Sequence, residues 1–227
     1  MFSRSGGHKT KETYTTRPGP PSPCKQGLKD QKATIFNLRE TFSKPEDETI
    51  WTAEWGGKGF FSHVTEHSKG VTMLINLTSK FQVSNVEIDP HGRYSITKLQ
   101  VEHTIFYVIN VYAPNDYREQ EQFIRILGEK LVSKTDTTKL IISGDWNAIR
   151  NKIDKWGELP WKETTYRNSI IGLMEELDLL DIYRQFHVDT KPVTYETKNS
   201  KLKSRIDFFH VSRPTHIMLK EPRCALP

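Results

Sequence analysis

The feature that most constrains this chain is an apolar segment that leads directly into polar residues. The segment Lys139-Leu-Ile-Ile-Ser-Gly-Asp-Trp-Asn147 ends with Gly144, Asp145 and Asn147. A second segment, Ser204-Arg-Ile-Asp-Phe-Phe-His-Val211, places Asp207 in a similar apolar setting. Both patterns are typical of buried β-strands, where an ionised carboxylate is costly unless a metal, a cation or a substrate group compensates it. The two segments therefore predict a functional site at the ends of core strands.

Length, charge and cysteine content place the chain in a broad class. Its 227 residues suit one domain with a tail, and its net charge of +5 and pI of about 9.1 favour polyanionic partners without demonstrating nucleic acid. Cys24 and Cys224 lie near opposite ends and indicate neither a disulfide framework nor a zinc cluster, which fits a reducing compartment. The sequence shows no signal-peptide pattern and no apolar run of roughly 18 residues. We therefore expect an intracellular protein with no membrane partner.

Composition predicts a disordered Pro-rich leader over residues 1–32, a folded domain over 33–213 and an unstructured tail over 214–227. The leader contains Arg17-Pro-Gly-Pro-Pro-Ser-Pro23 and too few apolar side chains to offset the entropy of ordering it. From about Thr34 onward, short apolar runs broken by turn residues are typical of strands. The expected strands are 34–38, 71–75, 81–88, 93–101, 104–111, 140–143 and 205–211, with a hairpin turn at 89–92.

Two segments have the periodicity of amphipathic helices. They run from about Glu119 to Val132 and from about Thr165 to Leu180. Their expected buried residues are Phe123, Ile126, Leu127 and Leu131 in the first, and Ile170, Leu173, Met174, Leu177 and Leu180 in the second. Because strands outnumber helices and the two are mixed in order, the pattern predicts an α+β sandwich in which helices cover packed sheets.

A series of short motifs runs through the domain in a specific order. The motifs are Leu38-Arg-Glu-Thr41, Trp55-Gly-Gly57, Ser68-Lys-Gly-Val71, Asn110-Val-Tyr-Ala-Pro-Asn115, Gly144-Asp-Trp-Asn147, Val193-Thr-Tyr195 and Ser204-Arg-Ile-Asp-Phe208. Each is weak alone, but the series resembles the endonuclease/exonuclease/phosphatase superfamily, most closely the endonuclease domain of LINE-type non-LTR retrotransposons. The resemblance covers about residues 33–213. It implies a four-layered α/β sandwich that hydrolyses a phosphodiester at the ends of its two sheets.

Phosphodiester hydrolysis needs an activated water, charge stabilisation at the phosphate oxygens and help for the leaving oxygen. Carboxylates are hard ligands for Mg²⁺, which keeps several waters and so needs only one or two of them. The resemblance implies Mg²⁺, or Mn²⁺, as the cofactor and Glu40 as its ligand, although Arg39 stands where the family usually has glutamine. The alternative interpretation of Glu40 is a solvated loop acid.

Asp145, Asn147 and Tyr112 are candidate catalytic residues. If the strand continues through Asp145, alternate spacing points Asp145 and Asn147 to one face. The resemblance implies that Asp145 positions or activates water, that Asn147 holds the substrate or that aspartate, and that Tyr112 reaches the phosphate. The alternatives are an Asx turn in which Asn147 caps the next segment, and a core aromatic with a solvated hydroxyl for Tyr112.

Asp207 is the fourth candidate catalytic residue, and it follows Ser204-Arg205 as in the family. The resemblance implies that this aspartate orients a catalytic histidine. Thr194 matches a family threonine near the DNA backbone, with a plain strand residue as the alternative. Asn115 is a candidate substrate-binding residue and is most simply a polar loop residue.

Other polar and aromatic residues have simpler interpretations. His63 and His67 have the spacing of a metal-binding pair but lack a helical pattern, so we expect solvated loop histidines. Trp156 and Trp161 could stack on bases, although packing in the core or a lid is favoured. Lysines in the two nearby loops favour DNA over a small substrate, with solvated surface lysines as the alternative; they are Lys155, Lys162, Lys198, Lys201 and Lys203.

The sequence also departs from the family. The family's first strand, which ends in an asparagine, and its last strand, with a Ser-Asp-His signature, have no counterpart here, and neither His210 nor His216 replaces the missing histidine by motif. We therefore expect a sandwich that lacks those two strands, and an impaired DNA endonuclease of retrotransposon type.

The expected partners are DNA and, in a full-length element, a reverse transcriptase that uses the 3′-hydroxyl, and the expected location is the nucleus. Two other functions stay open: a non-catalytic nucleic-acid-binding remnant, and a phosphatase that acts on a small phosphoester. Salt-sensitive DNA binding without a metal-dependent product would favour the first of these.

Overall fold

The computed structural model describes residues 33–65, 68–76, 81–134, 139–157, 160–197 and 202–216. The predicted leader lies outside these residues, as do Cys24, His67, Lys198, Lys201 and Cys224. The predicted tail is described only at its start, where residues 214–216 belong to the short helix α6 (Arg213–His216) and are not unstructured. In the described part of the chain, no helix is long and apolar enough to cross a bilayer.

The strands form three sheets. The small sheet is antiparallel, with the order β1 (Ile35–Arg39), β3 (Val71–Ile75), β2 (Lys58–Ser62). The large sheet has the order β4 (Phe81–Ile88), β5 (Tyr94–Val101), β6 (Thr104–Tyr112), β7 (Leu140–Asp145), β12 (Asp207–Ser212), β9 (Leu179–Asp181). Its β6–β7 pair is parallel, and its other pairs are antiparallel. A third sheet has the order β10 (Tyr195–Glu196), β11 (Leu202–Ser204), β8 (Lys155–Gly157).

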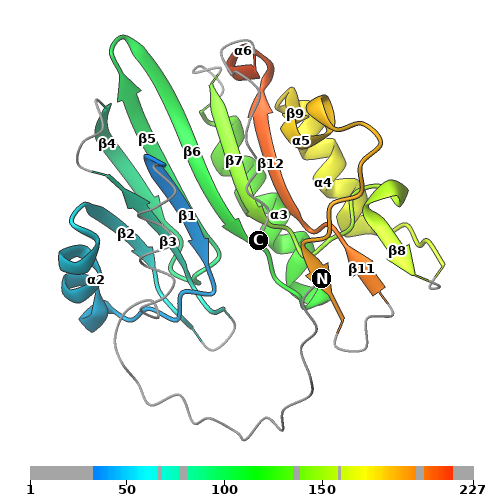
Figure 1. The fold of residues 1–227 in the computed structure, drawn as a ribbon, viewed down its shortest axis with the longest axis horizontal. Coiled ribbons are helices and arrows are strands. Elements are labelled where there is room, and N and C mark those ends of the chain that lie inside the picture. The colour runs from blue at the N-terminus through cyan, green and yellow to red at the C-terminus, as the bar shows by residue number, and fades with distance from the viewer. Residues whose placement is uncertain are drawn as a thin grey trace, which may run out of the picture.

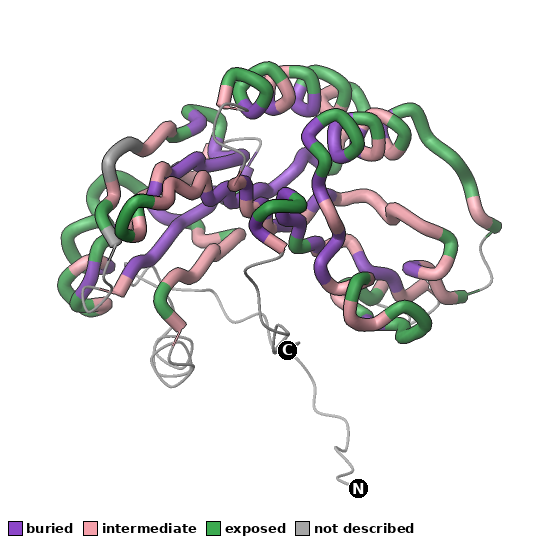
Figure 2. Tube along the Cα trace, turned by 90° about the horizontal axis from the view of Figure 1, so that it is seen from above, coloured by how far each residue is buried: buried purple, intermediate pink, exposed green. Residues whose placement is uncertain are grey.

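The layers confirm the predicted sandwich (Figure 1). Helix α2 (Glu48–Trp55) covers the outer face of the small sheet, where Trp51 packs with Phe61 and Leu74. The two sheets meet face to face around Met73, Ile75, Leu99 and Val108. Helices α3 (Tyr117–Val132) and α4 (Thr165–Glu176) cover the other face of the large sheet. Buried residues therefore follow the strands, while the helices turn exposed residues outward (Figure 2).

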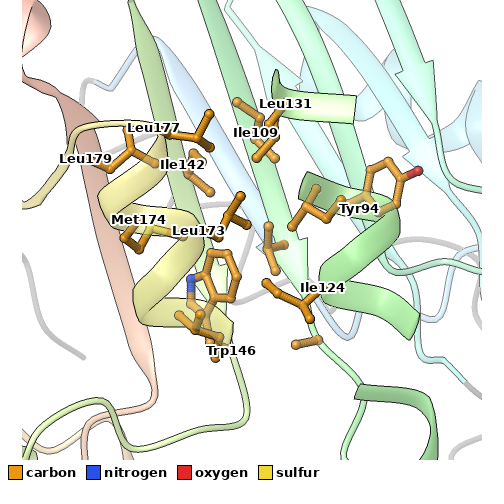
Figure 3. Packing of buried hydrophobic residues seen from close by; sticks show 14 of the residues in the cluster. Tyr94, Ile109, Ile124, Leu131, Ile142, Trp146, Leu173, Met174, Leu177 and Leu179 are labelled. Carbon is orange, nitrogen blue, oxygen red and sulfur yellow. The ribbon is translucent and has the colours of Figure 1, made fainter. Parts of the chain in front are cut away.

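The largest apolar cluster lies between the large sheet and helices α3 and α4 (Figure 3). Strand alternation sorts the side chains, since Ile142 of β7 enters this cluster while Ile141 packs between the sheets. Helix α3 contributes Phe123, Ile124, Leu127 and Leu131. The prediction of Ile126 as a buried position was wrong. The buried apolar face of α3 includes Ile124 and leaves Ile126 at its margin, at intermediate burial.

Helix α4 begins and ends at identifiable residues. Its start is capped by the Thr164 hydroxyl, which accepts a hydrogen bond from the Arg167 amide. The prediction that the helix continues to Leu180 was wrong. The helix ends at Glu176, Asp178 takes a left-handed conformation with φ 46°, and Leu180 then lies in the edge strand β9. Apolar spacing alone did not reveal this turn, because Leu177 is buried and Leu179 also faces the core.

Three shorter elements complete the described chain. They are the 3₁₀ helices η1 (Pro45–Asp47) and η2 (Lys152–Asp154) and the helix α5 (Ile182–Phe186). The predicted hairpin turn is confirmed between β4 and β5. There Gly92 has φ 72° and its amide donates to the Asp89 carbonyl at 3.2 Å, a conformation that favours glycine.

Candidate active site

Three of the predicted catalytic residues lie in one row across the large sheet. Asp145 at the end of β7 pairs in register with Tyr112, the last residue of β6, and with Asp207, the first residue of β12. Residues in register on neighbouring strands turn their side chains to the same face. Here that face is the one covered by the small sheet, because Asn110 and Ser143, two residues before Tyr112 and Asp145, both contact β1.

Polar bridges between the sheets hold the end of β1 above this row. The side-chain amide of Asn37 donates to the Ser143 hydroxyl at 2.7 Å. The side-chain amide of Asn110 donates to the backbone carbonyl of Leu38 at 2.9 Å and of Thr72 at 3.3 Å. Because buried amides need hydrogen-bond partners, these bridges fix how the two sheets meet. They carry Arg39 and Glu40 to the ends of β6, β7 and β12.

Glu40 lies in the left-handed conformation directly after β1, with φ 51°. Its Oε1 accepts a hydrogen bond from the Tyr112 hydroxyl at 3.1 Å, and its Oε2 lies 3.0 Å from the Lys69 ammonium. Its side chain is 44% exposed. Burial and the nearby charge of Glu40 raise the pKa of Tyr112 to about 12, so this phenol stays protonated at neutral pH. Tyr112 is thus both a buried aromatic and a hydrogen-bond donor into the site.

Asp145 and Asn147 come together by a turn and not by a continuing strand. Strand β7 ends at Asp145, and the Asn147 amide donates to the Asp145 carboxylate at 2.8 Å, which is the Asx turn given as the alternative. Asn147 has φ 48°, and its side chain donates to the Ala113 carbonyl at 2.6 Å. The strand does not continue through Asn147, so the condition for their alignment by alternate strand spacing is not met. Asn147 instead ties the β7 end to the residue after Tyr112.

Gly144 is required by a close approach of neighbouring backbones. A Cβ at this position would meet the Val111 carbonyl oxygen at 1.9 Å, and φ is +154°. No side chain fits there without moving β6 or β7. The glycine therefore lets the ends of the two parallel strands, with Tyr112 and Asp145, lie close together.

Charges surround Asp145 on the floor of the site. Burial raises its pKa above the ordinary value, and the charge of Glu40 acts in the same direction, while the Asn147 amide and the Arg39 charge oppose them. Burial lowers the pKa of Arg39, and the carboxylates of Asp145 and Glu40 oppose that effect. An arginine keeps its proton under such conditions. Arg39 is therefore a fixed cation among acidic side chains.

Asp207 has a different partner from the histidine that the resemblance implies. Its carboxylate forms an ion pair with the Arg39 guanidinium. His210 lies three residues further along β12, where it is fully buried and contacts Arg150 at 2.8 Å. His216 contacts the ring of Phe186 beyond the other end of β12. In residues 202–216, no histidine therefore accompanies Asp207.

The two predicted substrate-binding residues have different settings. The Thr194 hydroxyl accepts hydrogen bonds from the amides of Ile206 at 3.0 Å and Asp207 at 3.2 Å, so it supports the backbone that presents Asp207. Asn115 is exposed in the loop before α3 and makes no hydrogen bond within the described residues. Thr194 thus lies beside Asp207 at one end of the row, and Asn115 lies in the loop that follows Tyr112.

The loop between β7 and α4 lines a shallow basic hollow beside the third sheet. Its volume is about 430 Å³, and its lining residues are Lys152, Ile153, Lys155, Gly157, Trp161 and Lys191. Trp156 and Trp161 are both only partly buried, so neither is a core residue, and their predicted packing in a lid stays a prediction. Trp161 lies 5.1 Å from the Arg167 guanidinium, and Trp156 lies 6.0 Å from the Lys191 ammonium. Aromatic faces beside cations are a surface suited to nucleic acid.

Sequence reasoning missed several residues of the site. Lys69, Asn37 and Arg93 were not singled out, although Lys69 lies in the quoted motif Ser68-Lys-Gly-Val71. Arg93 lies 5.8 Å from the Tyr112 ring centroid and donates to Glu119 at 2.8 Å. His63, in contrast, contacts Glu48 at 2.9 Å and Ser43 at 3.2 Å. A buried asparagine inside a strand, such as Asn110, was the available signal for the contacts between sheets.

The donor set fits a divalent cation held mainly by water. Among the residues with described positions, no three His, Cys, Asp or Glu side chains form a metal cluster. Glu40 nevertheless presents an accessible carboxylate that already attracts the Lys69 ammonium. An exposed ion pair of this kind is worth about 0–1 kcal/mol, so Lys69 can yield its place. Mg²⁺ needs only one or two carboxylates, and Glu40 meets that requirement.

Comparisons with known proteins show what the chain is similar to in sequence and in fold. No family model matches the sequence. The chain is 28% identical over 187 residues to the transposon TX1 uncharacterized 149 kDa protein of Xenopus laevis, an alignment that covers 82% of this chain and 14% of that protein. The chain thus spans about a seventh of the length of this relative.

Two solved structures share the fold. The AP endonuclease LMAP from Leishmania major superposes with a TM-score of 0.71 at 16% identity, covering 86% of this chain and 74% of that one. The endonuclease domain of TRAS1, a telomere-specific non-LTR retrotransposon, superposes with a TM-score of 0.58 at 15% identity, covering 84% of this chain and 79% of that one. The resemblance inferred from the motifs is therefore confirmed: the chain has the fold of AP endonucleases and of a retrotransposon endonuclease domain, and it is similar in sequence to a transposon protein.

Proposed function

We propose that this chain is a metal-dependent DNA endonuclease domain of retrotransposon type, which nicks DNA and leaves a 3′-hydroxyl. One observation carries the proposal: Tyr112, Asp145 and Asp207 stand in register at the ends of three adjacent strands, with Glu40 hydrogen-bonded to Tyr112. A row of polar groups at the sheet ends suits a reaction on an extended phosphodiester. The similarity to a transposon protein and to two endonucleases supports the same conclusion.

Each residue has a proposed role in the hydrolysis. The Asp145 carboxylate orients the attacking water and takes up its proton, a task suited to a carboxylate whose pKa burial raises. The protonated Tyr112 hydroxyl donates to a phosphate oxygen when it leaves Glu40. Asn147 holds the Asp145 carboxylate through its amide, and Thr194 supports the backbone at Asp207.

Mg²⁺, or Mn²⁺, is the proposed cofactor, with Glu40 as its protein ligand. When bound, the ion supplies charge stabilisation at the phosphate oxygens and helps the leaving oxygen. The exposed position of Glu40 and its attraction for a cation support this assignment. The ion would displace the Lys69 ammonium, which frees that side chain to face the DNA backbone.

The proposal includes a reduced rate. In the described part of β12 and its flanks, the partner of Asp207 is an arginine, so no histidine is available there as a general acid or base. The absence of such a group typically costs about 10²–10⁴-fold. In a longer protein, we expect the domain to work in the nucleus beside a reverse transcriptase that extends the 3′-hydroxyl. The similarity to a transposon protein of which this chain covers 14% supports a place in a longer protein.

The test is the nicking of supercoiled plasmid by purified protein in Mg²⁺. We expect nicked circles that disappear in EDTA and in Asp145→Asn. The matched control is Asp178→Asn, which makes the same chemical change at an exposed carboxylate paired with Arg213 beyond the other end of β12. This variant should nick like the wild type.

A folded protein that never nicks would contradict the proposal. DNA binding that weakens steeply with added salt would then identify a non-catalytic binding remnant, an alternative favoured by the basic hollow at Lys152, Lys155 and Lys191. Metal-dependent release of phosphate from a small phosphoester, without nicking, would identify a phosphatase.

A further inference from the structure

Arg39 occupies the centre of the candidate site without being one of its expected members. It is the last residue of β1, and its guanidinium pairs with Asp207 on β12. The charges of Asp145 and Glu40 also act on it. Arg39 therefore contacts Asp207 of β12. It also lies within electrostatic range of Asp145 at the end of β7 and of Glu40, which follows its own strand.

The local charge explains why a fixed cation matters here. Glu40, Asp145 and Asp207 bring three carboxylates to the strand ends, against the two cations Arg39 and Lys69. Lys69 is 47% exposed, pairs with Glu40 and lies 5.7 Å from the Phe42 ring centroid, so it is a charge at the rim of the site. A phosphodiester adds another negative charge to this acidic surface. Arg39 is the cation built into the floor of the site that can offset it.

The guanidinium also has hydrogen-bond donors to spare. Arginine carries five N–H donors in a rigid fork. Asp207 engages Nη1, and within the described residues the Arg39 guanidinium makes no other hydrogen bond. The Arg39 side chain is 31% exposed, so its remaining donors are open to solvent and to a ligand. A planar fork with free donors matches the geometry of phosphate oxygens.

We propose that Arg39 is a further catalytic residue, which donates hydrogen bonds to the scissile phosphate, and that Asp207 is the positioning residue that aims it. The inference rests on the proposed function, since it assigns a phosphate contact within the same site. Arg39 keeps its proton throughout. It acts by stabilising the charge that develops on the phosphate oxygens as the water oxygen bonds to phosphorus and the bond to the 3′-oxygen breaks.

The first test compares nicking rates at saturating Mg²⁺. Arg39→Gln should nick about 100-fold more slowly, because an amide replaces the guanidinium and the positive charge that offsets the developing phosphate charge is lost. Arg39→Lys should fall between this variant and the wild type, because it keeps the charge but loses the fork. The matched control Arg213→Gln removes an exposed arginine beyond the opposite end of β12 and should leave the rate unchanged. Wild-type rates in Arg39→Gln would overturn the proposal.

The second test measures DNA binding in EDTA and needs no cleavage. The affinity for a short duplex is followed by fluorescence anisotropy between about 50 and 200 mM salt. If Arg39 contacts a phosphate, Arg39→Gln should lower the slope of log affinity against log salt by about one, and Arg39→Lys and Arg213→Gln should keep the wild-type slope. A merely structural arginine would not change this slope selectively, so an unchanged slope in a folded Arg39→Gln variant would overturn the proposal.

The two tests separate this inference from the proposed function. If the wild type does not nick but Arg39→Gln lowers the salt slope, the endonuclease proposal fails and the phosphate contact stands. If the wild type nicks and Arg39→Gln nicks equally well, the endonuclease proposal stands and the role of Arg39 fails. Thermal unfolding of each variant shows that it is folded, and Arg39→Lys serves as the test variant if Arg39→Gln is not.

Discussion

Two arginine–carboxylate clusters lie at neighbouring positions in this molecule and differ in how completely their charges are paired and buried. We call Arg205 with Asp154 and Asp181 the closed cluster, and Arg39 with Asp207 the open cluster. Arg205 is 2% exposed and makes four hydrogen bonds to Asp154 and Asp181, which are 0% and 6% exposed. Arg39 and Asp207 are 31% and 23% exposed, and among the described residues the Arg39 guanidinium pairs with one carboxylate. Arg205 thus uses four of its five N–H donors, whereas Arg39 keeps most of its donors free.

The closed cluster joins parts of the chain that would otherwise be loosely held. Asp154 lies in η2 and also pairs with Arg184 of α5, while Asp181 ends β9. Arg205 thus links the strand that carries Asp207 to the loop after β7. Fully paired buried charges hold a fold in one arrangement, but removal of one partner leaves an expensive unpaired ion. The open cluster is instead arranged to take a further partner, because its charges are incompletely satisfied by the protein.

The largest expected effect separates activity from stability at Asp145. Asp145→Asn should lower the nicking rate by about 10²–10⁴-fold, because it removes the base proposed for water. The same change should leave the melting temperature equal or higher, because burial raises the pKa of Asp145 and so disfavours its charged form. Nicking rates and thermal unfolding, measured on one preparation, check both parts. A variant that melts well below the wild type would show that Asp145 is structural.

A stability effect of similar size is expected in the closed cluster. Arg205→Met should lower the free energy of unfolding by about 3–5 kcal/mol, since Asp154 and Asp181 would remain buried without their partner. Urea unfolding measures this loss. Arg39→Met, in the open cluster, should cost much less, because Asp207 can gain water. Equal losses in the two variants would contradict the distinction between the clusters.

Gly144 tests how tightly the row of strand ends is packed. Gly144→Ala should cost about 1–3 kcal/mol and slow nicking, because its Cβ would overlap the Val111 carbonyl and displace Asp145. The matched control is Gly172→Ala in α4, where the added Cβ meets no atom within 4 Å. This control should gain about 0.5–1 kcal/mol, as alanine favours helix. Urea unfolding of the two variants should therefore move in opposite directions.

The smallest expected effect is the contribution of the closed cluster to the pH dependence of the free energy of unfolding. Burial raises the pKa of Asp181, but the hydrogen bonds and charge of Arg205 lower it more, so the net shift is below the ordinary value of 3.8. A lowered pKa contributes stability that is present above that value and is lost as pH falls through the folded pKa. Unfolding measured between about pH 2.5 and 6 should therefore show a shallower pH slope for Asp181→Asn. Identical slopes would contradict this assignment.

Much of the central fold could be predicted from the sequence. The bounds of β3 and β4 match their predicted ranges, and β6 extends the prediction by one residue. Helix α2, strand β2 and the third sheet were not predicted. Strands β8, β10 and β11 have only two or three residues, which is too short for a periodic pattern. Helix α2 has a weak apolar stripe, with Trp51 its buried residue.

The sequence by itself determined where carboxylates end buried strands, because strand periodicity and burial cost are local properties of the chain. Asp145 and Asp207 were found in that way, whereas Glu40 and Tyr112 were found through the resemblance of their motifs to a known family. Only the tertiary structure decided which of these side chains contact each other. The hydrogen bond from Tyr112 to Glu40 spans 72 residues, and the pairing of Arg39 with Asp207 spans most of the described chain. Such contacts depend on how the two sheets pack and on the left-handed backbone conformations of Glu40 and Asn147. No local sequence pattern encodes that packing.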